Sequence, residues 1–263
     1  MTLKAVAIVA HPDKPGVPAI EAELNELLAS EGLSVSHDAP DLVLALGGDG
    51  TMLRAAHLAH SRDALLLGVN RGSLGYLAEV EAGDEREALE RVLREDYVVE
   101  ERMMLSCSRR GEGMSRDLVG LNEVLVERSA HYRVVRLSVR VGGEQLAAFN
   151  ADGVIVATPT GSTAYALSAG GPIVSPRASC IVLVPVSPHM IFARPFVLAP
   201  DETVVVRLEA GQEASLSLDG ESAGTLETGG SVVVRRHPRP LKLIRLAGPG
   251  FIERLRAKLQ LPG

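Results

Sequence analysis

The stretch Asp41–Arg54, DLVLALGGDGTMLR, decides the fold of this chain. Its continuous apolar run, residues 42–46, is typical of a strand that is buried on both faces, as in a parallel sheet. Apolar residues then recur at helical spacing, which predicts a helix over residues 51–60. The glycine-rich turn between them therefore lies at the carboxyl end of a strand, where open parallel sheets bind their ligands.

Three glycines make this turn suitable for an anion. Gly47, Gly48 and Gly50 have no Cβ, so the backbone can approach a ligand closely and point its N–H groups at it, and Thr51 begins the predicted helix. Two common nucleotide-binding patterns do not match. A dinucleotide fingerprint needs a glycine in place of Leu53, and Gly-Lys-Ser/Thr occurs nowhere in the chain. The turn predicts a phosphate site of another class.

Asp49 is the unusual member of this turn, because a carboxylate repels phosphate. Three roles fit an aspartate here: it holds a Mg²⁺ that bridges to phosphate, it accepts a proton from a hydroxyl that attacks phosphate, or it caps the following helix. The preceding strand and both glycines favour the two chemical roles over the cap.

Composition limits the class of protein. The chain has 263 residues, of which 46% are hydrophobic, enough for one large domain or two modest ones. A formal charge of −6 argues against a general nucleic-acid binder. No apolar run approaches the roughly 20 residues of a membrane span, and the N-terminal apolar run is too short for a secretory signal. We therefore expect a soluble cytoplasmic protein, with Cys107 and Cys180 as buried thiols.

Strands and helices alternate in the first third of the chain. Strands are predicted over residues 3–10, 41–46 and 64–69, and helices over 18–31, 51–60 and 84–94. This alternation indicates a Rossmann-like parallel sheet. The third strand leads into a second glycine-rich segment, NRGSLGYL (70–77), at the same end of the sheet. Its Tyr76 fits either stacking on a base or nicotinamide, or plain anchoring of the loop.

From Tyr97 onward the pattern changes to short β-rich runs separated by Gly, Pro and polar turns, which predicts a second, mainly β domain. The chain ends with a strand, LKLIRL, and an amphipathic helix over 251–261 that resemble the first domain's elements. We expect an α/β domain over 1–98, a β-rich domain over 99–238, and a tail, 239–263, that packs back on the first domain.

Two segments of the β-rich part carry polar groups. Asn122 and Glu123 interrupt an otherwise apolar strand, where a polar pair on an edge strand is the simpler interpretation. The segment 149–172, FNADGVIVATPTGSTAYALSAGGP, combines an Asp-Gly turn, a strand, and a hydroxyl-rich loop at the start of a short helix. Such a loop suits ribose, an amide or phosphate. A serine hydrolase is disfavoured because the chain has no Gly-x-Ser-x-Gly elbow.

These motifs resemble a known family. GGDGT after a buried strand is similar to the signature of NAD kinases, of diacylglycerol and sphingosine kinases and, more loosely, of phosphofructokinases. GVNRGSLGYL, Asn122-Glu123, ADGVIVATPTGSTAYALSAGGPI, Pro188-His189 and Ala193-Arg194-Pro195 resemble the NAD kinase pattern in that order. The resemblance covers residues 43–196, with a compatible tail.

The resemblance implies transfer of phosphate from ATP, or from polyphosphate, to the adenosine ribose 2′-hydroxyl of NAD⁺, with Asp49 as the base. The implied phosphate-binding residues are Gly47, Gly48, Gly50, Thr51 and Arg54. The implied NAD-binding residues are Asp49, Gly50, Tyr76, Asn122, Glu123, Asp152, Thr160, Thr163, Ala164, Tyr165 and Ser168. Asn122 would contact adenine, Glu123 ribose and Asp152 the carboxamide end. The resemblance implies Mg²⁺ or another divalent cation held mainly by nucleotide phosphates. It also implies a homodimer or homotetramer in which a neighbour completes each site.

Two alternatives belong to other classes. A lipid kinase would keep the Gly-Gly-Asp turn but gives no reason for TPTGSTAY. A non-catalytic NAD(P)-binding regulator would be expected to have lost Asp49, which is present here. The motifs do not distinguish ATP from polyphosphate as the donor, or a dimer from a tetramer. They also do not show whether NADH is accepted, whether NADP(H) inhibits, or what role Asp219 has.

Overall fold

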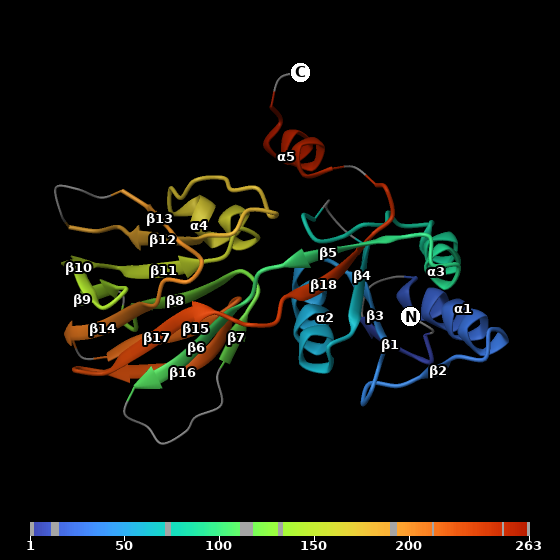
Figure 1. Ribbon diagram of the computed structural model, residues 1–263, viewed down its shortest axis with the longest axis horizontal. Helices are drawn as coiled ribbons and strands as arrows, with labels where there is room; N and C mark the ends of the chain where they lie inside the picture. The colour runs from blue at the N-terminus through green and yellow to red at the C-terminus, as the bar shows by residue number, and fades with distance from the viewer. Residues whose placement is uncertain are drawn as a thin grey trace. The chain divides into compact units, whose positions relative to one another are not determined.

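The computed structural model describes residues 3–11, 16–71, 75–110, 118–130, 134–189, 194–211, 213–248 and 250–261. The chain forms two compact units, one of Met1–Arg102 with Leu241–Gly263 and one of Met103–Pro240 (Figure 1). The second unit thus starts at Met103, where the sequence predicts residue 99, and ends at Pro240, where it predicts residue 238.

The first unit is an α/β domain. In chain order its elements are β1 (Ala5–Ala10), α1 (Val17–Ser30), β2 (Ser34–Val35), β3 (Leu42–Gly47), α2 (Asp49–Arg62), β4 (Leu65–Asn70), α3 (Glu85–Leu93), β5 (Val98–Arg102), β18 (Leu241–Arg245) and α5 (Phe251–Leu259). Its strands form one sheet in the order β2-β1-β3-β4-β18-β5. All neighbours are parallel except β18 and β5, so the predicted parallel sheet carries an antiparallel edge strand.

The long apolar strands fill the centre of this sheet. Every residue of β3 and β4 is buried, as expected for strands covered on both faces. Alternate side chains of these strands share one hydrophobic cluster with α1 and α3. Helix α2 packs against β3, β4 and β18 on the other side, where the absence of a Cβ at Gly68 leaves room for Met52.

The C-terminal segment returns to the first unit, as predicted. β18 pairs with β4 in parallel and with β5 antiparallel, which inserts it into the sheet (Figure 1). Because β5 belongs to this sheet, the first unit extends to Arg102. The predicted start of the second helix, Thr51, is wrong by two residues. α2 begins at Asp49, since Gly48 is the N-cap residue.

The second unit is mainly β. In chain order its elements are β6 (Leu105–Arg110), β7 (Leu118–Gly120), β8 (Glu123–Arg128), β9 (Val135–Val141), β10 (Glu144–Ala151), β11 (Gly153–Ala157), the 3₁₀ turn η1 (Gly161–Thr163), α4 (Tyr165–Ser168), β12 (Ile181–Val186), β13 (Phe196–Leu198), β14 (Val204–Ala210), β15 (Glu213–Leu218), β16 (Glu221–Glu227) and β17 (Ser231–Arg236). They form two antiparallel sheets, β10-β9-β14-β17-β6-β7 and β13-β12-β11-β8-β15-β16.

These two sheets pack face to face. Leu137 and Val139 of β9 share one core with Val154 and Val156 of β11, which belongs to the other sheet. The alternate residues of β11 form a second cluster that includes Ala166 of α4. The β11 sheet is therefore covered on one face by the sandwich core and on the other by the loop and helix that follow it.

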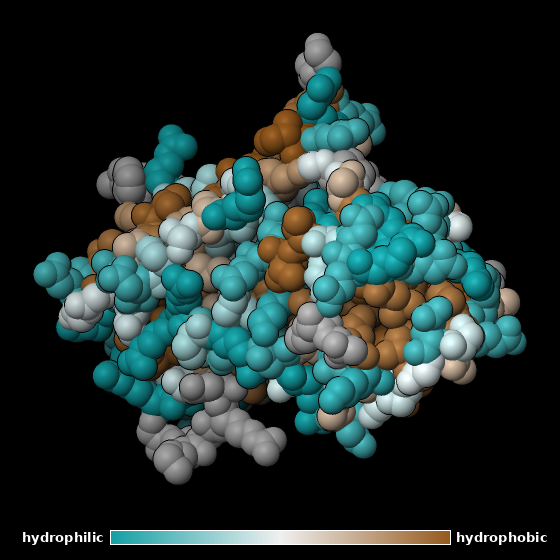
Figure 2. Space-filling model, turned by 45° about the vertical axis from the view of Figure 1, so that its right-hand side comes forward, coloured by the Kyte–Doolittle hydropathy of each residue, from teal (hydrophilic) through white to brown (hydrophobic). Residues whose placement is uncertain are grey.

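Hydrophilic side chains predominate on the surface shown in Figure 2, with hydrophobic ones gathered in several places. The large apolar side chains that are exposed include Val98 and Val99 on edge strand β5, and Ile252 on α5. Cys107 and Cys180 are buried thiols, as predicted. Among the residues that the structure describes, no helix combines the length and the apolar character needed to cross a membrane.

Candidate functional site

Gly47, in the glycine turn (residues 47–50) at the end of β3, makes close contacts with Arg71 and Thr51. The Gly47 carbonyl accepts a hydrogen bond from the Arg71 N–H (3.0 Å), which ties the turn to the end of β4. A Cβ on Gly47 would lie 2.4 Å from Oγ1 of the buried Thr51, so only glycine permits this packing. Among the residues that the structure describes, a Cβ on the exposed Gly50 would have nothing within 4 Å. Open space thus lies beside the first turn of α2, where backbone N–H groups suit an anion.

Asp49 is the first helical residue, and Gly48 occupies the N-cap, so the capping role considered for Asp49 does not apply. Its side chain is 64% exposed, and its Oδ2 lies 3.9 Å from Nζ of Lys258. A Cβ on Gly75 would lie 2.6 Å from Oδ1 of Asp49, so the second glycine segment leaves the space that this carboxylate occupies. A solvent-accessible carboxylate therefore lies next to the phosphate-suited turn, with a cation beside it.

Tyr76 contacts the C-terminal helix. Its ring centroid is 6.3 Å from that of Phe251, and the Lys258 ammonium lies 4.5 Å from the centroid of the Tyr76 ring. Burial, and then the charge of Asp49, raise the pKa of the Tyr76 hydroxyl. These contacts agree with the anchoring interpretation of Tyr76. Arg54 is exposed on α2, one turn after the glycines.

The helix α5 is held to the sheet by a buried carboxylate, Glu79. Its Oε1 accepts hydrogen bonds from the backbone N–H groups of Leu246 (2.8 Å) and Gly248 (3.0 Å). Its Oε2 pairs with Arg245 (2.6 Å) and with the buried Arg254 of α5 (3.0 Å). Because a buried charge is stable only when paired, removal of one partner destabilises the whole group.

In the second unit, Asn122 lies where the chain passes from one sheet to the other. β7 belongs to the sheet of β6, and β8 to the sheet of β11, so the single apolar strand predicted around Asn122-Glu123 is two strands. Asp219 holds the segment between β7 and β8 in place. Its carboxylate accepts hydrogen bonds from the N–H groups of Leu121 (2.7 Å), Asn122 (2.7 Å) and Glu123 (3.1 Å). Sequence inspection left Asp219 without a role, because its partners are remote in the chain.

Glu123 is a buried carboxylate, 7% exposed, at the start of β8. Its Oε2 has no hydrogen-bond partner among the described residues. Burial, followed by the charge of Asp219, raises the pKa of Glu123 to about 7. A buried acceptor without a protein partner is costly, so this oxygen is suited to accept a hydrogen bond from a ligand or a water molecule.

The hydroxyl-rich loop after β11 packs against the segment around Asn122 that joins β7 and β8. The Thr158 N–H donates to the Asn122 carbonyl (2.9 Å), and a Cβ on Gly161 would lie 2.0 Å from that carbonyl oxygen. Two hydroxyls hold the loop itself: Ser162 donates to the Pro159 carbonyl and Thr163 to the Thr160 carbonyl. Ala164, Tyr165 and Ser168 follow in the short helix α4 and at its N-cap.

Asp152 lies at the opposite end of β11 from this loop. The strand has five residues, so the two ends are roughly 15 Å apart. Oδ1 of Asp152 pairs with Nε of Arg128 (2.9 Å). Tyr165 is 40% exposed, and burial and then the charges of Glu127 and Asp152 raise its pKa, which puts its hydroxyl within electrostatic reach of Asp152.

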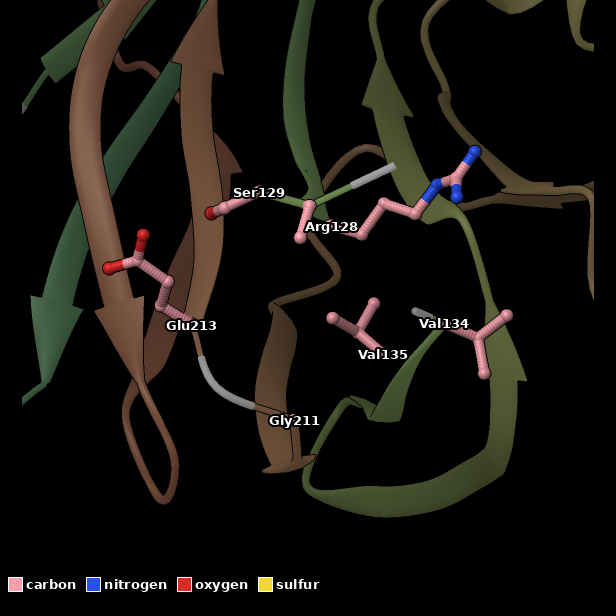
Figure 3. Close-up of a pocket in the computed structure, with 7 residues that line it drawn as sticks. Arg128, Ser129, Val134, Val135, Gly211 and Glu213 are labelled. Atoms are coloured by element: carbon pink, nitrogen blue, oxygen red, sulfur yellow. The ribbon is translucent and has the colours of Figure 1, made fainter. Parts of the chain in front are cut away.

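A small pocket of about 100 Å³ lies next to Arg128 (Figure 3). Arg128, Val135 and Glu213 line it, and the Arg128 side chain points away from Glu213 (Figure 3). This volume is well below that of ordinary ligand pockets, roughly 300–1,000 Å³. The pocket alone does not accommodate a dinucleotide.

The structure thus assembles the predicted residues into three groups. The first unit brings together the glycine turn, Asp49 and Tyr76. In the second unit, Asn122 and Glu123 lie against the loop that contains Thr160, and the charge of Asp152 contributes to the raised pKa of Tyr165. Lys258 was not found from the sequence, because a lysine in an amphipathic terminal helix carries no motif.

Comparisons with known proteins agree with this arrangement. Residues 29–97 match the family model of the ATP-NAD kinase N-terminal domain, and residues 121–246 match that of the ATP-NAD kinase C-terminal domain. An NAD kinase of Gemmatimonas aurantiaca is 42% identical, with 97% of this chain and 95% of that protein covered. An NAD kinase of Leifsonia xyli subsp. xyli is 43% identical, with 98% and 85% covered.

Two solved structures are similar over nearly the whole chain. An NAD kinase from Archaeoglobus fulgidus in complex with ATP has a TM-score of 0.78 at 26% identity, covering 98% of this chain and 100% of that one. Yeast NADH kinase complexed with NADH has a TM-score of 0.88, covering 100% and 89%. At 23% identity, the second likeness concerns the fold alone.

Proposed function

The chain belongs to the ATP-NAD kinase family, and from that membership we propose that it transfers the γ-phosphoryl group of ATP to the adenosine ribose 2′-hydroxyl of NAD⁺. The products are NADP⁺ and ADP. The observation that carries the proposal is the exposed Asp49 carboxylate, placed at the start of α2 beside three glycines and open space at Gly50.

The glycine turn binds the donor phosphates in this proposal. Backbone N–H groups at the start of α2 point toward the phosphate oxygens, and Gly47, Gly48 and Gly50 allow them to approach. Thr51 belongs to the same turn, and the exposed Arg54 adds a positive charge one helical turn later. Polyphosphate is a second possible donor, because it offers the same chain of phosphoryl groups.

Asp49 acts as the general base. The 2′-hydroxyl oxygen attacks the γ-phosphorus, the bond between that phosphorus and the β,γ-bridging oxygen breaks, and the hydroxyl proton passes to the Asp49 carboxylate. The leaving electron pair remains on the terminal oxygen of ADP. This role requires a carboxylate that solvent and substrate can reach, which its 64% exposure supports.

NAD⁺ is bound by groups from both ends of β11. The orphaned Oε2 of Glu123 accepts hydrogen bonds from ribose, with Asn122 contacting adenine. Asp152, at the other end of β11, binds the carboxamide end of a dinucleotide held by a neighbouring subunit. The remaining residues proposed to line this dinucleotide site are Asp49, Gly50, Tyr76, Thr160, Thr163, Ala164, Tyr165 and Ser168.

A divalent cation such as Mg²⁺ fits the proposed donor site. Mg²⁺ usually keeps several waters and is held by substrate phosphates, so the donor phosphates beside the glycine turn would supply its main ligands. When bound, the ion neutralises charge that develops on the phosphates. We further propose a cytoplasmic homodimer or homotetramer in which a neighbouring subunit completes each site.

The family match favours this function over the alternatives from the sequence. The curated relatives are NAD kinases, and both family models are ATP-NAD kinase domains, so a lipid kinase has no support. The intact Asp49 argues against a non-catalytic regulator.

One assay tests the proposal. Purified chain is incubated with NAD⁺, Mg²⁺ and either ATP or polyphosphate, and the NADP⁺ formed is measured with an NADP⁺-specific dehydrogenase. Omission of the donor is the blank, and NADH in place of NAD⁺ measures acceptor choice. Absence of NADP⁺ with both donors, from protein shown to be folded, would reject the proposal.

A further inference from the structure

The C-terminal helix α5 places a cation beside the glycine turn. Nζ of Lys258 lies 3.9 Å from Oδ2 of Asp49 and 4.5 Å from the centroid of the Tyr76 ring. The Lys258 side chain is 26% exposed, so most of it is shielded from solvent. Its ammonium group lies beside Asp49 at the start of α2. An ammonium held between a carboxylate and an aromatic face is stabilised by both.

The rest of α5 orients this lysine. Arg254 precedes Lys258 by four residues, so the two side chains lie on the same face of the helix. Arg254 is 2% exposed, donates to the Ala78 carbonyl and pairs with Glu79 at 3.0 Å. This buried anchor sets the rotation of α5 and thereby directs Lys258 toward Asp49.

The charges around the glycine turn suggest why a cation is needed there. The turn suits phosphate, yet it carries the negative Asp49, which opposes an anion. Arg71, which follows β4, pairs with Glu85 at 2.9 Å. Lys258 lies 3.9 Å from the proposed base, and a lysine binds phosphate as a mobile point charge on a flexible stem.

We propose that Lys258 is a catalytic residue of the phosphoryl transfer, an inference that rests on the function proposed above. In the ligand-free protein its ammonium pairs with Asp49. When the donor is bound, the ammonium donates hydrogen bonds to an oxygen of the transferred phosphoryl group, where it stabilises the charge of the transition state. The same shift leaves the Asp49 carboxylate available for the ribose proton.

The test compares Lys258→Met with Lys258→Arg and with a matched control, Arg256→Met. Methionine keeps the length of the aliphatic stem but removes the charge, and arginine keeps the charge. Arg256 is an exposed cation on the same helix, so its loss changes net charge equally without reaching the turn. Thermal melting of all three proteins establishes that they are folded.

Lys258→Met should lower kcat by about 10²-fold while KM for NAD⁺ changes by less than about threefold. Lys258→Arg should recover part of the loss, and Arg256→Met should behave as the parent. A residue that only holds α5 in place would lower the melting temperature and leave kcat of the folded protein near that of the parent. That result would overturn the proposal.

A binding measurement separates this inference from the proposed function. Calorimetry measures the affinity for the non-hydrolysable analogue adenosine 5′-(β,γ-imido)triphosphate with Mg²⁺, in the parent and in an Asp49→Asn background. Lys258→Met should weaken this binding by about tenfold in both backgrounds, because the ammonium contacts phosphate directly. Unchanged affinity in the Asp49→Asn background would mean that Lys258 acts only through Asp49, and would overturn the phosphate contact.

The two proposals can fail separately. If the parent binds the analogue and Lys258→Met weakens that binding, yet no NADP⁺ forms, the proposed acceptor is wrong and the lysine contact stands. If the parent forms NADP⁺ and Lys258→Met matches it in kcat and in analogue affinity, the function stands and the lysine contact is wrong. A parent that neither binds the analogue nor forms NADP⁺ with either donor contradicts both.

Discussion

Asp219 and Glu123 are joined by a reciprocal pair of hydrogen bonds. The Glu123 N–H donates to Oδ1 of Asp219 (3.1 Å), and the Asp219 N–H donates to the Glu123 carbonyl (3.1 Å). Asp219 adopts a left-handed backbone conformation, with φ of 51°, to make these contacts. The relationship puts a second carboxylate near the buried Glu123 side chain, which makes ionisation of Glu123 unfavourable.

The first prediction concerns pH and Glu123. Burial and Asp219 raise the pKa of Glu123 from 4.5 to about 7, so the folded chain holds this proton more tightly than the unfolded chain does. The associated stability is fully present below about pH 4.5 and is lost as pH rises through about 7. The free energy of unfolding of Glu123→Gln minus that of the parent should therefore rise by about 3 kcal/mol between about pH 4.5 and a pH above about 7.

Urea denaturation of both proteins from about pH 4.5 to about pH 8 measures this difference. Glu221→Gln, an exposed position on β16, controls for the substitution itself. Parallel pH profiles of the parent and Glu123→Gln would contradict the prediction.

Gly50→Ala tests the phosphate-binding turn. A Cβ on Gly50 meets no atom of the described residues within 4 Å, and alanine is the better helix former by about 1 kcal/mol. The free energy of unfolding should therefore stay level or rise. The new methyl group occupies the space proposed for phosphate, so KM for ATP should increase by about tenfold or more. Thermal melting measures the stability, and initial rates at increasing ATP concentration give KM for ATP. Unchanged KM for ATP would remove Gly50 from the phosphate site.

Asp49→Asn tests the proposed base. Asparagine keeps the size of the side chain but cannot accept the proton, so kcat should fall by about 10²-fold or more. The affinity for NAD⁺ should stay within several-fold of the parent value, because the main contacts lie elsewhere. Stopped assays for NADP⁺ and direct NAD⁺ titration measure the two quantities. A variant that turns over at nearly the parent rate would exclude Asp49 as the base.

Assembly is tested by mixing two inactive proteins. Asp49→Asn and Asp152→Ala should each be nearly inactive, but if sites are completed by a neighbouring subunit, a mixed oligomer contains some sites with both carboxylates. Reassembly of the mixture should restore up to about a quarter of parent activity for random pairing in a two-subunit site. Mass spectrometry of labelled subunits verifies exchange. A mixture that has exchanged and stays inactive would show that each site belongs to one chain.

Local patterns determined the elements and the class of site. The apolar run Leu42–Leu46, followed by glycines, predicts a buried parallel strand ending in an anion-suited turn, because side-chain burial and glycine geometry act over a few residues. The order of the motifs was also enough to suggest the family. These inferences needed no knowledge of which distant residues meet.

Only the tertiary structure decided the contacts between distant segments. It assigned β5 to the first sheet through pairing with β18, and split the predicted strand at Asn122 where Asp219 accepts three backbone hydrogen bonds. It also brought Lys258 to Asp49, although the two lie near opposite ends of the chain. Such contacts arise when separate elements bury their apolar faces against a common sheet, and a linear pattern does not encode which charged side chains that packing brings together.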